Sequence, residues 1–191
     1  MAARATREQI VEAADRLFYE HGFEPASFSE IAAAVGISRG NFYYHFKTKD
    51  EILDAVVALR LARTEAMLAR WEADAADPAE AVLNFIRILI ANQAKIMLYG
   101  CPVGSLCTEL AKLEHPAFPQ ASRIFDLFRA WLARQFKALG LARPEDLALH
   151  ILARSQGIAT LATAFKDAEF VRREVDLAEA WLQAEIAKAQ H

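Results

Sequence analysis

An all-α fold is predicted for this chain of 191 residues by three features of its sequence. Alanine, the strongest helix former, is abundant, whereas glycine and proline number only 7 and 6. Apolar residues recur at helical spacing along most of the chain, and no stretch alternates as a half-buried strand does. Hydrophobic residues make up 54% and charged residues 25%, which is typical of folded globular proteins. The length allows one or two compact domains.

The first helix is predicted to begin at Thr6, because Thr6 and Gln9 match a capping box, and to end at Gly22. Its inward-facing residues are expected to be Ile10, Ala14 and Leu17. We expect this helix to support the two that follow it.

Residues 27–49 predict two short helices joined by a tight turn. Ser27 and Glu30 form a capping-box pattern at the start of the first helix. Gly36 is expected to end that helix in the left-handed conformation, and Ser38 is suited to cap the second. The predicted arrangement is helix, turn, helix.

The second of these helices has two different faces. Phe42 and Phe46 lie four residues apart on the face expected to anchor the helix, whereas Arg39, Tyr43 and Lys47 share an outer face. An outer face with basic and phenolic side chains and without acids suits the major groove of DNA, where arginine contacts guanine and cations contact phosphates. The alternative is an ordinary helix pair in which all the aromatic residues belong to the core.

The predicted DNA-contacting residues are polar and aromatic side chains of this helix pair and its flanks. They are Ser27, Ser38, Arg39, Asn41, Tyr43, Tyr44, His45, Lys47 and Lys49.

Lys49 begins the next helix, which Thr48 and Glu51 cap. A cation at this end of a helix is disfavoured by about 0.3 to 1 kcal/mol. A phosphate bound there explains the placement, since helix amino termini bind phosphate.

The segments that carry a family resemblance are residues 27–32, 35–38, 42–46 and 49–53. They resemble the DNA-binding domain of TetR-family transcriptional regulators. The resemblance implies an N-terminal three-helix helix-turn-helix DNA-binding domain at residues 1–48, followed by a helical-bundle ligand-binding and dimerisation domain at residues 49–191. It also implies a homodimeric repressor that a small-molecule effector releases from a palindromic operator in double-stranded DNA.

The charge balance limits how such a chain binds DNA. A net charge of −3, from 22 basic and 25 acidic residues, excludes a polycation, so DNA affinity must depend on a local patch. Two cysteines are too few for a disulfide framework. No catalytic constellation, metal-ligand set or phosphate loop is recognisable, so we predict neither enzyme activity nor a cofactor nor a metal.

The amino terminus lacks the apolar core of a signal peptide. No run of residues approaches the ~20 apolar positions of a membrane span. We therefore expect a cytoplasmic protein without membrane contacts.

Two long helices are predicted after the DNA-binding region. The first continues from Lys49 past Trp71 to a break near Pro78, and the second covers residues 79–98, which are apolar over most of the helix circumference. Asn92 is expected to project from the apolar face of the second helix. Two interpretations are open: a core amide satisfied within the protein, or a hydrogen bond to a bound ligand.

Residues 100–104 are expected to interrupt the helices. A short helix should run from Ser105 to near His115, and a longer one should start between Pro116 and Pro119. The longer helix carries an aromatic stripe at helical spacing: Phe125, Phe128, Trp131, Leu132 and Phe136. Such a stripe belongs more often to a core than to a ligand site, although the family resemblance implies that this region also walls the ligand cavity.

The last two helices are predicted to run from Pro144 to about Phe165 and roughly over residues 171–187. The first of them has a row of small or apolar residues: Ala153, Gly157, Leu161 and Ala164. The second has two apolar rows: Val171, Val175, Ala178 and Leu182, and Leu177, Trp181 and Ala184. The resemblance implies that both helices pair with their copies in a second subunit, and packing within one subunit is the alternative.

Three candidates exist for the effector site. The first is an apolar cavity suited to a small organic molecule, lined by Phe85, Leu89, Asn92, Phe125, Phe128 and Trp131. The second is Arg154 on an apolar face, for which an acid of the protein or its partner subunit is a more frequent partner than an anionic ligand. The third is Cys101, in a segment resembling one from electrophile- and oxidant-responsive family members, with a small buried cysteine as the alternative. The expected effector is therefore apolar or electrophilic.

Overall fold

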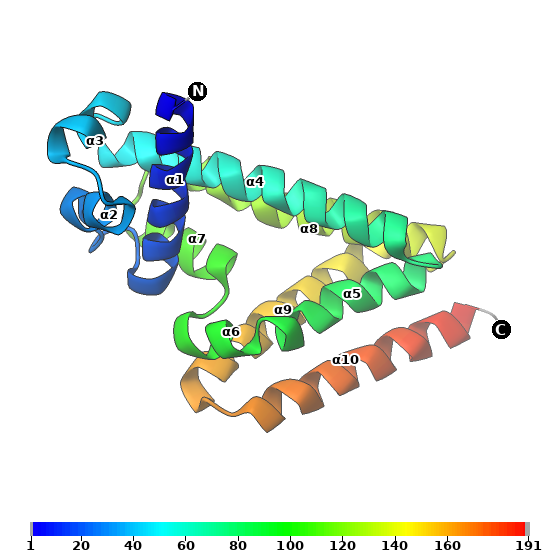
Figure 1. Cartoon of the computed structure of the whole chain (residues 1–191). Coiled ribbons are helices and arrows are strands. Elements are labelled where there is room, and N and C mark those ends of the chain that lie inside the picture. Colours follow the sequence, from blue (N-terminus) through cyan, green and yellow to red (C-terminus); the bar gives the residue numbers. More distant parts are fainter. Residues whose placement is uncertain (1, 190–191) are drawn as a thin grey trace. The chain divides into compact units, whose positions relative to one another are not determined.

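The computed structural model describes residues 2–189, and within this range it contains ten helices and no strand. The helices are α1 (Ala2–His21), α2 (Phe28–Val35), α3 (Arg39–His45), α4 (Lys49–Asp74), α5 (Pro78–Ala91), α6 (Gln93–Tyr99), α7 (Pro102–Lys112), α8 (Phe118–Ala138), α9 (Pro144–Phe165) and α10 (Ala168–Ala189), and Figure 1 shows them in order. The all-α prediction is confirmed. None of these helices is by itself long and apolar enough to cross a bilayer, although the bent pair Pro78–Ala91 and Gln93–Lys112 together has the length and composition.

The helices form two compact units. The first comprises Met1–Arg63 and Pro102–Ile124, and the second comprises Thr64–Cys101 and Phe125–His191. Both α4 and α8 therefore contribute to each unit, and α7 groups with the amino-terminal helices. This division by packing differs from the expected functional segments 1–48 and 49–191, whose assignment stays a prediction.

The core of the first unit is built largely by α1, α2, α3 and the first half of α4. Ile10 and Ala14 of α1 are fully buried, as predicted, whereas Leu17 is half-buried and Phe18 takes a deeper position. The other large side chains that are fully buried here are Ile31, Phe42, Phe46, Ile52, Leu53, Leu110 and Ile124. Each fully buried side chain of this size contributes about 1.5 to 3 kcal/mol to folding. This burial fixes α2 and α3 on α1.

α1, α7 and α10 start earlier than the sequence predicts, α10 at Ala168 and not near residue 171. α1 begins at Ala2, not at Thr6, because its alanine-rich start favours helix more than the capping pattern favours a boundary. α7 begins at Pro102, not at Ser105. Proline fits the first position of a helix, where its missing N–H is not needed.

Asn92 breaks the helix predicted over residues 79–98. Its backbone, with φ of −109° and ψ of 13°, separates α5 from α6. Its side-chain Nδ2 donates to the Ile88 carbonyl at 3.1 Å, the kind of local bond that competes with helical hydrogen bonding. The side chain is exposed, so the prediction that Asn92 projects from an apolar core face is wrong.

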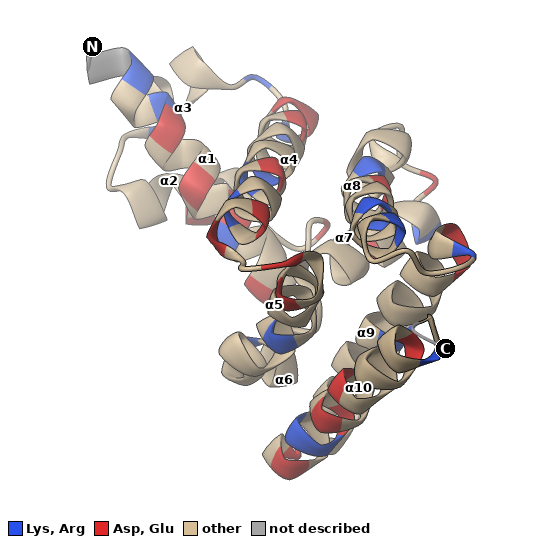
Figure 2. Ribbon diagram, turned by 90° about the vertical axis from the view of Figure 1, so that its right-hand side faces the viewer, with Lys and Arg blue, Asp and Glu red and all other residues tan. Residues whose placement is uncertain are grey.

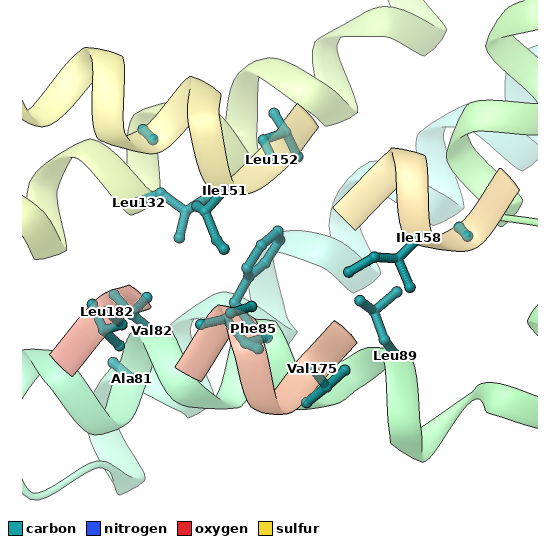
Figure 3. Close-up of a cluster of buried hydrophobic side chains, with 14 of the residues drawn as sticks. Ala81, Val82, Phe85, Leu89, Leu132, Ile151, Leu152, Ile158, Val175 and Leu182 are labelled. Atoms are coloured by element: carbon teal, nitrogen blue, oxygen red, sulfur yellow. The ribbon is translucent and has the colours of Figure 1, made fainter. Parts of the chain in front are cut away.

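In the second unit, α5, α9 and α10 lie side by side (Figure 1). In the close-up of their core in Figure 3, Phe85 of α5 points toward Ile151 of α9, and Leu89 of α5 points toward Ile158. α10 contributes the predicted row of Val171, Val175, Ala178 and Leu182, all of them buried. This row therefore belongs to the core of the chain itself.

Candidate DNA-binding surface

α2 begins with a complete capping box, as predicted. The Ser27 hydroxyl accepts a hydrogen bond from the Glu30 N–H at 3.2 Å, and the Glu30 carboxylate accepts one from the Ser27 N–H at 2.8 Å. Hydrogen bonding to Ser27, through its side chain first and its backbone second, lowers the pKa of Glu30 below its ordinary value. Ser27 is exposed.

The turn between α2 and α3 is a Schellman motif. Gly36 has φ of 73° and ψ of 31°, in the left-handed region, and its N–H donates to the Ala33 carbonyl at 3.1 Å. The Ile37 N–H donates to the Ala32 carbonyl, also at 3.1 Å. Any other residue at position 36 would be strained by this φ, so the predicted role of the glycine is confirmed.

α3 is anchored on one side and exposed on the other. Phe42 and Phe46 are each 1% exposed, whereas Tyr43 is 44% and Tyr44 is 72% exposed. The Ser38 hydroxyl caps the helix by accepting a hydrogen bond from the backbone N–H three residues later at 3.3 Å. The predicted division of α3 into two faces is confirmed.

Two side chains on the outer face of α3 are held by α2. Arg39 donates from Nη2 to the Ser29 hydroxyl at 2.8 Å. The Tyr43 ring packs edge-on against Phe28, with ring centres 5.6 Å apart. The sequence prediction omits Ser29, because no periodic spacing connects it to an arginine ten positions away.

Lys47 and Lys49 both bond to backbone carbonyls. Lys47 Nζ donates to the Tyr43 carbonyl near the end of α3, where a cation also favours the helix dipole. Lys49 Nζ donates to the Glu24 carbonyl at 2.8 Å and to the Ala26 carbonyl at 3.3 Å. An ammonium has three N–H donors, so each lysine keeps at least one for a phosphate.

α4 starts where the sequence predicts. The Thr48 hydroxyl accepts a hydrogen bond from the Glu51 N–H at 3.1 Å, while the Glu51 carboxylate accepts one from the Lys47 N–H at 2.7 Å. The second bond falls one residue earlier than a capping box requires. Tyr44 and His45 are the last two residues of α3, and the centres of their rings lie 5.1 Å apart. His45 is half-buried. Asn41 is exposed.

The basic character of this surface is local. Figure 2 shows acidic and basic residues interspersed along α1, α4 and α10. Arg4 pairs with Glu8 at 3.0 Å, and Arg63 pairs with Glu12, whose hydrogen bond raises the pKa of Arg63. α3 itself contains no acid. The potential around α3 is therefore set by the placement of a few cations.

The predicted effector-contacting residues lie in the second unit, and the structure brings most of them together. Phe85, Leu89 and Trp131 are buried in its core, and Phe125 and Phe128 are partly buried against the same cluster. The rings of Phe85 and Phe128 lie 5.6 Å apart. The aromatic stripe of α8 therefore belongs to the core of the second unit, but its Phe125 and Phe128 side chains remain partly exposed.

Two other candidates lie apart from this cluster or at its edge. Asn92 is exposed at the break between α5 and α6, as described above. Cys101 is partly buried just before α7, and Cys107 is buried within α7. Contact of Asn92 or Cys101 with an effector stays a prediction.

Arg154 pairs with an acid of the same chain, as the more frequent alternative predicts. Its Nη2 donates to a Glu174 carboxylate oxygen at 3.2 Å. The exposed His150 packs its ring against Trp181, with ring centres 4.7 Å apart. Within residues 2–189 no group of three or more His, Cys, Asp or Glu side chains is placed to hold a metal ion.

This chain is similar to known proteins in its amino-terminal sequence, in its sequence as a whole and in its fold. Residues 10–56 match the family described as bacterial regulatory proteins, tetR family. Over 182 residues the chain is 30% identical to an uncharacterised HTH-type transcriptional regulator in the lacX 3′ region of Lactococcus lactis subsp. lactis, covering 91% of each chain. It is 25% identical over 127 residues to the HTH-type transcriptional repressor DhaR of Mycobacterium sp. (strain GP1), covering 66% of this chain and 63% of that protein.

A solved structure also shares the fold. A TetR-family transcriptional regulator from Agrobacterium tumefaciens matches with a TM-score of 0.82 at 20% identity, covering 93% of this chain and 97% of that chain. At this identity the match concerns the fold alone.

Proposed function

Since the chain belongs to the tetR family of bacterial transcriptional regulators, we propose that it is a homodimeric repressor whose α3 enters the major groove of a palindromic operator. The family and the relatives are transcriptional regulators, so the chain is a DNA-binding regulator and not an enzyme. In this proposal a small apolar or electrophilic molecule is the effector and releases the operator.

The observation that carries the proposal is the division of α3 into two faces. Phe42 and Phe46 are buried, while Arg39, Tyr43 and Lys47 are exposed on the other side. A helix fixed in this way offers its basic and phenolic side chains to base edges and phosphates together. Each subunit contributes one such helix, so the half-sites should lie about 34 to 36 Å apart or a multiple of that distance.

Exposed small and apolar residues on α9 support pairing with a second copy. Ala153, Gly157 and Ala164 are exposed, and Leu161 of the same row is 42% exposed. No atom lies within 4 Å of the position that a Cβ on Gly157 would take, so another helix has room to approach. On α10, Leu177 is 50% exposed. Pairing of α9 and α10 with their copies would cover these residues.

The effector site is proposed in the second unit, beside Phe85 and the partly buried rings of Phe125 and Phe128. Apolar walls with few polar groups suit a small organic molecule. Cys101 is the alternative point of entry for an electrophile, which a thiolate attacks. As the family resemblance implies, the effector tilts α4 and changes the separation of the two α3 helices. By linkage, an effector that weakens operator binding binds the DNA-bound protein less tightly by the same factor.

A gel-shift assay tests the DNA-binding proposal. The probes are the DNA upstream of the protein's own gene and a pool of sequences enriched by in vitro selection. Wild type should bind one or both, and Tyr43→Ala should lose about 1 to 3 kcal/mol of binding free energy. Phe118→Ala, which removes an exposed ring outside the predicted contact set, is the matched control and should bind as wild type does. Absence of binding by wild type to both probes, or full affinity in Tyr43→Ala, would contradict the proposal.

A further inference from the structure

The α1–α2 turn, residues 22–26, is held by one carboxylate of α7. Glu109 accepts two hydrogen bonds of 2.8 Å, with Oε2 from the Phe23 N–H and with Oε1 from the Glu24 N–H. Both N–H groups lie in the turn, so no helix supplies their acceptors. Hydrogen bonds to a charged carboxylate are stronger than those between neutral groups. One side chain therefore fixes two consecutive peptide units.

The ammonium of Lys49 binds the same turn through its carbonyl groups. Lys49 Nζ donates to the Glu24 and Ala26 carbonyls at 2.8 and 3.3 Å, and it lies 4.5 Å from the centre of the Phe23 ring. The carboxylate of Glu109 thus satisfies N–H groups of the turn, and the ammonium satisfies its C=O groups.

Gly22 leaves room for the carboxylate. A Cβ at this position would lie 3.2 Å from Glu109 Oε1 and 3.3 Å from Oε2, which is closer than ordinary contact. The backbone of Gly22 also has φ of 95°, which side chains rarely tolerate. The close approach of Glu109 to the turn therefore depends on a glycine at this point.

α7 is fixed to the first unit near both of its ends. Arg60 donates from Nη1 to the Pro102 carbonyl and from Nε to Asp15 of α1, both at 2.6 Å. Beyond the other end of α7, His115 Nε2 lies 3.4 Å from Asp50 Oδ1 at the start of α4. Glu109 therefore extends from a helix that is itself held against α1 and α4.

We propose that Glu109 is a positioning residue for operator binding, which it supports by holding the α1–α2 turn and so setting where α2 begins. The turn ends at Ala26, directly before Ser27, the N-cap of α2. A displaced turn therefore changes the orientation of α2, and α3 follows through the short Gly36 turn. This inference rests on the proposed DNA-binding function. Glu109 makes no contact with DNA in this arrangement.

The test compares Glu109→Gln with Glu114→Gln in the full-length protein. Both variants remove one negative charge, but only Glu109 bonds to the turn, and Glu114 is exposed after the end of α7. Loss of a negative charge by itself strengthens binding to DNA, so Glu114→Gln should bind the operator as tightly as wild type or slightly more tightly. Glu109→Gln should bind about tenfold more weakly, because its amide replaces one acceptor by a donor facing a backbone N–H. The slope of log affinity against log salt concentration should stay unchanged in both, since no phosphate contact is lost.

Hydrogen exchange of the DNA-free protein measures the turn directly. The amides of Phe23 and Glu24 should exchange faster in Glu109→Gln than in wild type, while amides in the core of the second unit exchange at the wild-type rate. Glu109→Asp, which keeps the charge but is one methylene shorter, should show an intermediate loss of operator affinity. If these amides exchange faster in Glu109→Gln but the wild type binds no operator, the DNA-binding function is contradicted, whereas the contact between Glu109 and the turn is supported. Operator affinity equal in Glu109→Gln and Glu114→Gln, or unchanged exchange at both amides, would overturn the role of Glu109.

Discussion

Arg39, the first residue of α3, donates a hydrogen bond from Nη2 to the hydroxyl of Ser29 in α2 at 2.8 Å. The guanidinium is thereby restrained before DNA is bound, and it has donors to spare, because a guanidinium carries five N–H groups. A long side chain that is ordered in advance avoids an entropy loss of about 0.5 to 1.5 kcal/mol on binding.

We predict that Ser29→Ala weakens operator binding by about two- to tenfold, since Arg39 must then be ordered when the complex forms. Fluorescence anisotropy with a labelled operator measures the change. Ser122→Ala is the control, because it removes a hydroxyl of the first unit that donates to the Pro119 carbonyl within α8. Tighter binding by Ser29→Ala would show instead that Ser29 holds Arg39 away from the DNA.

Lys49→Ala should weaken operator binding and reduce the slope of log affinity against log salt concentration by about one. The ammonium of Lys49 already donates to two carbonyls, and its third N–H is the one proposed to contact a phosphate at the start of α4. Lys112→Ala, at the end of α7, makes the same change in net charge and should leave the slope as in wild type. A lower affinity with an unaltered slope would mean that Lys49 acts only through the α1–α2 turn.

The capping box of α2 should make stability depend on pH in the acid range. The pKa of Glu30 is lowered, so its charged form is favoured in the folded state. Its contribution is therefore fully present above the ordinary glutamate pKa of about 4.3 and is lost as the pH falls through the lowered folded-state pKa. Ser27→Ala should unfold a few degrees below wild type at neutral pH, and this difference should shrink from about pH 4 downward.

The matched control for the capping box is Ser38→Ala. Ser38 caps α3 through a backbone N–H alone, and α3 contains no acid. Its loss should lower the unfolding temperature by an amount that stays nearly constant with pH. Calorimetric scans at several pH values separate the two variants, and a pH-independent difference for Ser27→Ala would show that Glu30 contributes nothing through its charge.

Local signals in the sequence predict most helix boundaries, because each boundary depends on residues that are close together. Gly22 and Gly36 have positive φ where the sequence places helix ends, and Pro144 begins α9. The break at Asn92 lacks such a signal, since the apolar periodicity continues through it and only the bond to Ile88 marks it.

Contacts between residues that are far apart in the sequence cannot be predicted from the spacing of residues along the chain. Glu109 lies 86 positions from Phe23, so its bond to the turn becomes visible only once α7 is placed against α1. The meeting of Phe85 and Phe128 is easier to anticipate, because both lie on apolar faces that must be covered. Whether the row containing Gly157 faces a partner or the subunit's own core depends on how the other helices fill that core first.

Leu161→Glu should convert the proposed dimer to monomers. Leu161 is 42% exposed in the row of small residues on α9, and a charge buried there by a second subunit would lack a partner. Analytical ultracentrifugation gives the oligomeric state, and operator affinity should fall in parallel, because the two half-sites are no longer contacted by one particle. Leu98→Glu is the control, since Leu98 on α6 is 60% exposed and outside this row. A monomeric wild type, or a dimeric Leu161→Glu, would exclude α9 as the interface.

Cys101 should be the thiol through which an electrophile releases DNA. It is partly buried, whereas Cys107 is only 7% exposed, so a reagent in solution reaches Cys101 more readily. An adduct on Cys101 adds bulk directly before Pro102, the first residue of the helix that holds the α1–α2 turn through Glu109. N-ethylmaleimide should therefore release operator from wild type and from Cys107→Ser but not from Cys101→Ser, as followed by gel shift with mass spectrometry of the adducts. Equal release from wild type and Cys101→Ser would leave the apolar site beside Phe85 as the proposed entry point of the effector.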